Sequence, residues 1–301
     1  MEPELPSDDD GCWGWQEVEE EGEELLEEPR PKRKRITKKF EGPSIEEVMK
    51  VEQVPHRMPD LWLVPVPPSL STVLQDDLME VYSPPRLVPL AAKAGLRASV
   101  SLDLLTGWDF VSMDAKVAAV QEIKARRPKV LMLSPPCTMF SGLMNLNWSK
   151  LERGKREQSL HQGTNHLEFS MLLADIQDSA GRGWCFEHPA SARSWKNNAV
   201  KRMAEGSLEA CFDQCMFGLR SKVNQVAMKK STRLLTNIPQ IYYMFHMRRC
   251  DRMHVHCSIQ GSEGGEKRSV WAQRYPPPLC DQLIEAFKAY LATGSEGAGS
   301  T

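Results

Sequence analysis

The chain has 301 residues, 41% of them hydrophobic and 26% charged, with a formal net charge of −2, which suits one large globular domain or two small ones. Eight cysteines in a chain of this length, without a charged-then-apolar leader, argue against a secreted disulfide scaffold, so we expect reduced thiols in the cytosol or nucleus. Charged residues or proline break every apolar run before the roughly 20 residues that a membrane helix needs, which excludes a membrane span.

The net charge hides a strong asymmetry along the chain. Residues 1–28 contain 13 acidic side chains and no Lys or Arg, which leaves 38 basic against 27 acidic residues, a net charge of +11, over 29–301. We expect residues 1–60 to be a disordered tail, first acidic and then basic. The run Arg30 to Arg35 places five positive charges in six positions, the pattern of a nuclear-import signal or a nucleic-acid-binding arm. It favours a nuclear location, with the cytoplasm as the alternative, and the basic body is compatible with a polyanionic partner.

Beyond the tail, strands and helices are predicted to alternate. A proline-rich extended lead-in is expected over 61–77, a folded domain over 78–292 and a disordered end over 293–301. Strands are predicted at 78–82, 99–102, 130–133 and 184–186, and helices at 88–95, 114–126 and 166–179 and from about 279. The alternation predicts an α/β fold, Rossmann-like, with a doubly wound and mostly parallel sheet, whose ligands bind beyond the carboxyl ends of the strands.

Three polar residues follow predicted strands and so are expected at that edge: Asp103, Cys137 and Glu187. Cys137 comes after two prolines and just before a predicted helix start, a position that suits an exposed nucleophile. The alternative is an inert buried cysteine in a tight turn.

Two segments in this region carry a family resemblance. The segment SPPCTMFS at 134–141 resembles the nucleophile loop of the DNA (cytosine-5) methyltransferases, usually Pro-Cys-Gln-x-Phe-Ser, and FEHP at 186–189 looks like their Glu-Asn-Val segment. MFGL at 216–219 followed by KSTRLL at 230–235 is similar to the family's aromatic-Gly stretch and basic strand. The resemblance covers roughly Leu78 to Leu291 and is nearest to methyltransferase-like segments of retroelement polyproteins.

The resemblance implies methyl transfer to carbon 5 of cytosine in DNA, with RNA as a possible substrate. Cys137 would add to C6 of the ring, and the Glu187 carboxylic acid would hydrogen-bond N3. Arg233 would hold the carbonyl O2, with Lys230 as its substitute. The base would have to be flipped from a duplex. A basic rim is expected to hold the phosphates: Lys150, Arg153, Lys155, Arg156, Lys229 and Lys230.

The resemblance also implies S-adenosylmethionine as the methyl donor, bound at the first strand–turn–helix unit. The expected cofactor-binding residues are Tyr82, Ser83, Asp103, Asp109, Phe110 and Pro135. The first turn departs from the family, because it reads Tyr-Ser-Pro-Pro-Arg where the family has an aromatic residue and glycines, and prolines neither donate N–H groups nor adopt positive φ. For both aspartates, the alternative is a turn or helix-cap role.

A short insert at 236–278 takes the place of the family's target-recognition domain, so we expect slight sequence preference. It contains Cys250, His254, His256 and Cys257, four potential zinc ligands. Their spacing does not match the usual paired pattern, so we favour ordinary polar loop residues and no metal. Cys211 and Cys215 are interpreted as packed thiols.

Two other functions fit the same residues. One is a catalytically inactive methyltransferase-like module that binds nucleic acid in a mobile element, which the Pro84-Pro85 turn favours. The other is a cysteine hydrolase that pairs Cys137 with His188 or His166. Binding of S-adenosylmethionine would distinguish these functions.

Overall fold

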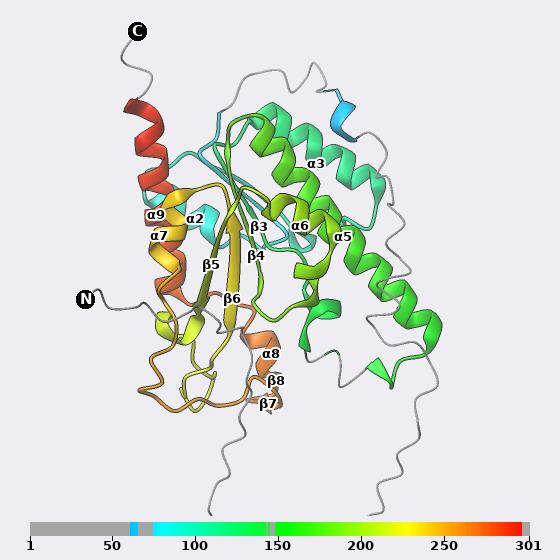
Figure 1. Ribbon diagram of the computed structural model, residues 1–301, viewed down its shortest axis with the longest axis vertical. Helices are drawn as coiled ribbons and strands as arrows, with labels where there is room; N and C mark the ends of the chain where they lie inside the picture. Colours follow the sequence, from blue (N-terminus) through cyan, green and yellow to red (C-terminus); the bar gives the residue numbers. More distant parts are fainter. Residues whose placement is uncertain (1–60, 66–74, 143, 145–147, 297–301) are drawn as a thin grey trace, which may run out of the picture. The chain divides into compact units, whose positions relative to one another are not determined.

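The computed structural model describes residues 61–65, 75–142, 144 and 148–296. The predictions for the acidic segment 1–28, the basic run 30–35 and the last five residues lie outside this part of the chain. Within it, the polypeptide forms an α/β domain built on a six-stranded sheet (Figure 1). No helix in the described ranges is long and apolar enough to cross a membrane.

The sheet has the strand order β2-β1-β3-β4-β6-β5. The strands are β1 (Leu78–Val81), β2 (Ala98–Leu102), β3 (Val130–Leu133), β4 (Gly183–Pro189), β5 (Leu208–Asp213) and β6 (Ser231–Thr236). The first four run parallel, whereas β6 is antiparallel to both β4 and β5. The predicted α/β class and mostly parallel sheet are therefore confirmed.

Helices cover both faces of the sheet. The main helices are α2 (Leu87–Lys93), α3 (Met113–Arg126), α5 (Arg153–Ser179), α6 (Asn198–Ala204), α7 (Pro239–Phe245), α8 (Arg268–Trp271) and α9 (Pro277–Glu296). Helices α3, α5 and α6 pack on one face, and α2, α7 and α9 pack on the other. A separate two-stranded ribbon, β7 (Ser262–Glu263) and β8 (Glu266–Lys267), lies in the predicted insert.

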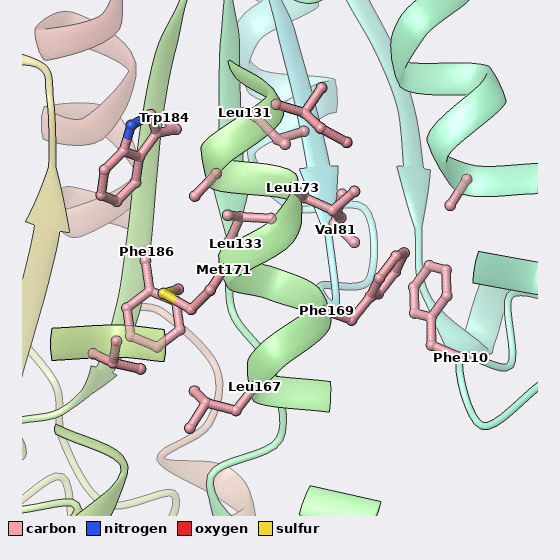
Figure 2. Close-up of a cluster of buried hydrophobic side chains, with 14 of the residues drawn as sticks. Val81, Phe110, Leu131, Leu133, Leu167, Phe169, Met171, Leu173, Trp184 and Phe186 are labelled. Atoms are coloured by element: carbon pink, nitrogen blue, oxygen red, sulfur yellow. The ribbon is translucent and has the colours of Figure 1, made fainter. Parts of the chain in front are cut away.

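Strands β1 and β3 are buried along their whole length, and β3 accordingly reads as a continuous apolar run rather than an alternating one. Figure 2 shows the core beneath α5, where Leu167, Met171 and Leu173 face β3 and β4. On the opposite face, Cys185 and Leu234 belong to the core that α7 and α9 cover. The sheet is thus held in place from both sides.

Three boundaries differ from the sequence predictions. Helix α5 begins at Arg153 rather than near His166, because its first turns are polar and carry no apolar periodicity. The lead-in expected to be extended contains a 3-10 helix at Leu61–Leu63, whose Leu61 is buried in the core on the α3 side. Helix α9 continues to Glu296, four residues past the predicted end of the domain.

The carboxyl ends of the parallel strands are joined by hydrogen bonds that continue past the strands themselves. The Tyr82 N–H donates to the Leu102 carbonyl at 2.9 Å, and the Ser134 N–H donates to the Val81 carbonyl at 3.1 Å. The loops after β1, β2 and β3 therefore leave the sheet side by side, with β1 between β2 and β3 in the strand order.

Candidate active site at the carboxyl edge of the sheet

Cys137 lies in the short loop after β3, where the sequence predicts it. The loop leaves the strand through Ser134, Pro135 and Pro136, and Cys137 is the residue before the 3-10 helix Thr138–Phe140. The Phe140 N–H donates to the Cys137 carbonyl at 3.0 Å, and the Phe140 ring is buried beneath the loop. Two prolines and one buried aromatic residue thus fix the thiol at the edge of the sheet, with its residue half-buried.

Glu187 lies inside β4 rather than after it. The strand continues to Pro189 because β6 pairs with it, with Glu187 opposite Leu234 and Pro189 opposite Thr232. Glu187 is only 8% exposed, and its Oε1 has no hydrogen-bond partner among the residues that the structure describes. A buried carboxyl oxygen without a partner is costly, and a catalytic role or a bound ligand is one explanation for such a group.

Cys137, Glu187 and Lys230 interact electrostatically. Burial raises the pKa of the Cys137 thiol, the Lys230 ammonium lowers that pKa, and the Glu187 carboxylate raises it. Lys230 comes directly before β6, next to the strand that pairs with β4. A thiol, a carboxyl and an ammonium group from three segments therefore lie within electrostatic range of one another at the carboxyl edge.

Sequence reasoning missed Tyr275, which closes this group of side chains. Its hydroxyl lies 3.1 Å from the Ser134 Oγ, and its ring has the Arg86 guanidinium at 5.5 Å and the Lys230 ammonium at 6.0 Å. Burial raises the pKa of Tyr275 well above its usual value, and the Glu187 carboxylate adds to that shift. The tyrosine comes just before the prolines that start α9, and this position alone gave no signal of a site.

Arg233 lies on the other face of the sheet from Glu187. Residues opposite each other on paired strands point to the same face, and successive residues alternate. Glu187 is opposite Leu234, so it points toward the α7–α9 face, whereas Arg233 is opposite His188 and points toward the α5–α6 face. There the guanidinium stacks on Trp195 at 4.7 Å and pairs with Glu209 at 3.3 Å. The structure therefore brings Lys230, not Arg233, to Cys137 and Glu187.

The expected cofactor-binding turn after β1 has an unusual backbone. Tyr82 has a φ of 63°, the left-handed conformation that glycine normally supplies in such turns. Its hydroxyl lies 3.1 Å from the His166 Nδ1, and its ring packs on Phe110 at 4.8 Å. Ser83 is buried and its carbonyl accepts a hydrogen bond from Ser101. Tyr82 thus makes the turn that Pro84 and Pro85 cannot make.

The start of α2, just after this turn, is occupied by a side chain of the protein. Glu80 is buried in β1, and its Oε2 accepts hydrogen bonds from the N–H groups of Arg86, Leu87 and Val88 at 3.1, 2.9 and 2.8 Å. These are the groups that hold phosphates in dinucleotide sites. The turn is therefore closed to a phosphate ligand.

Asp103 and Asp109 both make the turn contacts that were the alternative to cofactor binding. The Asp103 Oδ1 accepts from the Leu105 N–H at 2.9 Å, and the Asp109 Oδ1 accepts from the Val111 N–H at 3.0 Å. Asp103 nevertheless stands at the carboxyl end of β2, next to Tyr82. Large apolar side chains are exposed around both carboxylates: Leu104, Leu105, Val111 and Met113.

The two histidines proposed as hydrolase partners have other contacts. The His188 Nδ1 lies 2.6 Å from the Ser194 Oγ, its ring stacks on Phe186 at 5.3 Å, and burial lowers its pKa to about 3. Burial also lowers the pKa of His166, which contacts Tyr82. Between these described residues, no hydrogen bond joins either imidazole to the Cys137 thiol. The geometry gives little support to a hydrolase.

The predicted basic rim is partly paired with acidic residues. Arg153 pairs with Glu157 at 2.8 Å and Lys155 with Glu152 at 3.2 Å, while the Arg156 guanidinium stacks on Trp148 at 5.5 Å. His166 contacts Tyr82, which follows β1 at the carboxyl edge of the sheet. The helix continues for 13 residues, about 20 Å, from His166 back to its start at Arg153. Figure 1 shows this half of α5 extending away from the sheet.

No protein-family model matches the chain, and no curated protein matches it.

Proposed function

We propose that this protein is a Rossmann-like methyltransferase that transfers a methyl group from S-adenosylmethionine to carbon 5 of cytosine in DNA. The observation that carries the proposal is the grouping of Cys137, Lys230 and Glu187, whose Oε1 has no partner among the described residues, at the carboxyl edge of a mostly parallel sheet. These are the three kinds of group that addition to a cytosine ring requires.

Cys137 acts as the nucleophile. Its Sγ would form a bond to C6 of the flipped-out base while the ring electron pair moves to C5. C5 would take the methyl group from the sulfonium sulfur of S-adenosylmethionine, whose bond to the methyl carbon breaks and leaves its electron pair on that sulfur. Transfer of the C5 proton to water and cleavage of the S–C6 bond would then restore the ring and the thiolate. The Lys230 ammonium favours the thiolate form, and the prolines before Cys137 hold it in place.

Glu187 and Lys230 stabilise the ring during this attack. A protonated Glu187 donates a hydrogen bond to N3, which gives its buried Oε1 the partner that it lacks within the described part of the chain. Lys230 interacts with the carbonyl O2, the role that the family resemblance gives to a basic residue of this segment. Arg233 instead supports Trp195 from the opposite face.

The residues after β1 and β2 fit S-adenosylmethionine in their chemistry, and the bound cofactor would supply the methyl group. The ligand contains no phosphate, so a turn whose amides are occupied by Glu80 does not exclude it. Asp103 has a second carboxyl oxygen for the ribose hydroxyls, and the exposed side chains of Leu104 and Leu105 suit the adenine. Tyr82, Ser83, Asp109, Phe110 and Pro135 complete the proposed set.

The proposed DNA-binding face is the projecting start of α5 together with Lys229 and Lys230. Residues 150–157 contain four basic and two acidic side chains, a net charge of +2. Nuclear location through the Arg30 to Arg35 run belongs to the same proposal. RNA is an alternative substrate, because the ring chemistry is the same.

The inactive nucleic-acid-binding module is the second candidate function. It is favoured by the Pro84-Pro85 turn, whose prolines donate no N–H groups to a cofactor. Such a module would bind DNA through α5 but would not bind S-adenosylmethionine.

The test is covalent trapping on DNA that contains 5-fluorocytosine. Fluorine at C5 cannot leave as a proton does, so an adduct formed by Cys137 persists once the ring is methylated. With S-adenosylmethionine present, we expect the wild-type protein to form an adduct that survives denaturation and contains the Cys137 peptide. Cys137→Ser should abolish the adduct.

A matched set of variants locates the chemistry. Glu187→Gln and Lys230→Met should each slow methylation of ordinary cytosine at least tenfold, whereas Arg233→Met should leave the rate within about threefold. An adduct that forms on RNA but not on DNA would show that RNA is the substrate, while the proposed mechanism would stand. No adduct together with no calorimetric binding of S-adenosylmethionine would overturn the proposal in favour of the inactive module.

A further inference from the structure

Two cysteines and two histidines gather near the carboxyl end of β5, outside the candidate active site. Cys215 lies in the 3-10 helix Gln214–Phe217 that follows β5, and Cys250, His254 and His256 lie in the loop after α7. One ligand atom from each residue lies within 4.8 Å of the other three. We propose that these four side chains bind one zinc ion, which fastens the insert to the sheet.

The distances within the group suit tetrahedral zinc. The Cys250 Sγ is 3.7 Å from the His254 Nε2 and 3.5 Å from the His256 Nε2. With a Zn–S bond of about 2.3 Å and a Zn–N bond of about 2.0–2.1 Å, sulfur and nitrogen ligands of one tetrahedral ion are separated by about 3.6 Å. The side chains therefore already stand at ligand spacing.

The backbone explains how distant segments come together. Asp213 is buried at the end of β5, where its N–H donates to the Arg248 carbonyl at 3.0 Å and its Oδ2 accepts from the Cys250 N–H at 2.8 Å. These bonds bring the start of the loop beside Cys215. His254 and His256 alternate along the chain, with Val255 between them pointing outward at 82% exposure, so both imidazoles face the same side.

Two further contacts support the proposed ligands. The Asp251 Oδ1 lies 3.5 Å from the His254 Nδ1, the ring nitrogen that faces away from Cys250. Carboxylates commonly orient metal-bound histidines in this way. The Arg252 N–H points at the Cys250 Sγ at 3.3 Å, and an N–H directed at sulfur favours the thiolate that a metal requires.

Four protein ligands fill a tetrahedral site, so the ion would be structural rather than catalytic. The loop has a need for such support, because no residue from Arg249 to His256 is fully buried and Met253 is 85% exposed. A loop without apolar burial gains little from packing, and a metal supplies the missing stabilisation. Thiolate and imidazole ligands in a tetrahedral arrangement select zinc.

The structure also changes the ligand set that the spacing suggested. Cys257 belongs to the run of potential ligands in the sequence, but its Sγ points to the Val226 carbonyl at 3.8 Å and is outside the group. Cys215, interpreted from the sequence as a packed thiol, takes the fourth place. Cys257 therefore serves as a control for Cys215, because Cys215 is predicted to bind the metal and Cys257 is not.

The experiment measures metal content in the full-length protein purified without added chelator. We expect one zinc per chain by mass spectrometry of the metal. Cys215→Ser, Cys250→Ser and His256→Ala should each reduce the bound zinc at least tenfold, and Cys257→Ser should leave it unchanged. After removal of zinc, cobalt(II) should restore the visible absorption bands of a tetrahedral thiolate site in the wild type and in Cys257→Ser.

Wild-type protein that contains no zinc and gives no tetrahedral cobalt spectrum would overturn the proposal, as would loss of metal in Cys257→Ser with retention in Cys215→Ser. A Cys215–Cys250 disulfide in protein purified under reducing conditions would overturn it as well. None of these readouts depends on methyl transfer, so failure here is distinguishable from failure of the proposed function.

Discussion

The Tyr275 hydroxyl and the Ser134 Oγ lie 3.1 Å apart, although 141 positions separate them in the chain. This contact ties the start of α9 to the loop that carries Cys137. The Tyr275 ring also has cations from Arg86 and Lys230 beside it, at 5.5 and 6.0 Å. A side chain from the far end of the domain therefore holds the loop that carries Cys137. The same tyrosine ring also contacts Lys230, the cation that interacts with Cys137.

Tyr275→Phe should lower the free energy of unfolding by about 1 kcal/mol, because it removes this hydrogen bond and leaves the Ser134 hydroxyl without its partner. Urea denaturation measures the change. Tyr243→Phe is the matched control, since Tyr243 is 72% exposed and its substitution should leave the midpoint unchanged. Equal midpoints for the wild type and Tyr275→Phe would mean that the contact contributes nothing to stability.

The pKa of the Cys137 thiol should respond in opposite directions to its two charged neighbours. Glu187→Gln removes a negative charge and should lower the pKa, whereas Lys230→Met removes a positive charge and should raise it. The pH dependence of Cys137 alkylation by iodoacetamide, followed on its peptide by mass spectrometry, reports this pKa.

Arg233→Met serves as the control for that titration, because Arg233 is engaged by Trp195 and Glu209 on the other face. It should leave the alkylation profile unchanged. An alkylation profile that shifts with Arg233→Met but not with Lys230→Met would show that Arg233, and not Lys230, interacts with the Cys137 thiol.

Asp103→Asn separates the two roles of Asp103. An asparagine oxygen still accepts from the Leu105 N–H, so the cap persists and unfolding by urea should change little. If the carboxylate holds the ribose hydroxyls, S-adenosylmethionine should bind about tenfold more weakly by calorimetry, the loss expected from a charge-assisted hydrogen bond of about 1.5 kcal/mol. Unchanged affinity in Asp103→Asn would remove Asp103 from the cofactor site.

The sequence predicted the elements whose burial is complete. Strands such as Val130–Leu133 are apolar on both faces, and the prolines and Cys137 that follow mark the end of the strand without reference to distant residues. The carboxyl-edge position of Asp103 and Cys137 followed from that pattern alone. The start of α5 escaped prediction because polar residues from Arg153 onward carry no periodicity.

The pairing of distant segments was beyond the sequence. Whether Arg233 or Lys230 meets Glu187 depends on the register between β4 and β6, since a shift of one residue exchanges the faces. Likewise, spacing within one loop suggested Cys257 as a metal ligand, while the hydrogen bonds of Asp213 bring Cys215 from another segment. Tyr275 enters the site only through the packing of α9.

His188 should make the protein sensitive to acid. Burial lowers the pKa of His188 in the folded state from 6.5 to about 3. Between these two pH values, the imidazole is protonated in the unfolded chain but neutral in the folded protein. The free energy of unfolding is therefore highest above pH 6.5 and decreases as the pH falls from 6.5 toward 3. The loss relative to pH 7 amounts to about 2 kcal/mol at pH 5.

Urea unfolding of the wild type and of His188→Gln at pH 7 and pH 5 measures this loss. The difference in free energy of unfolding between the wild type and His188→Gln should decrease by that amount at pH 5. Ser194→Ala, which keeps the buried imidazole and removes its hydroxyl partner, should retain the acid sensitivity. An advantage that is equal at pH 7 and pH 5 would show that His188 does not resist protonation in the folded protein.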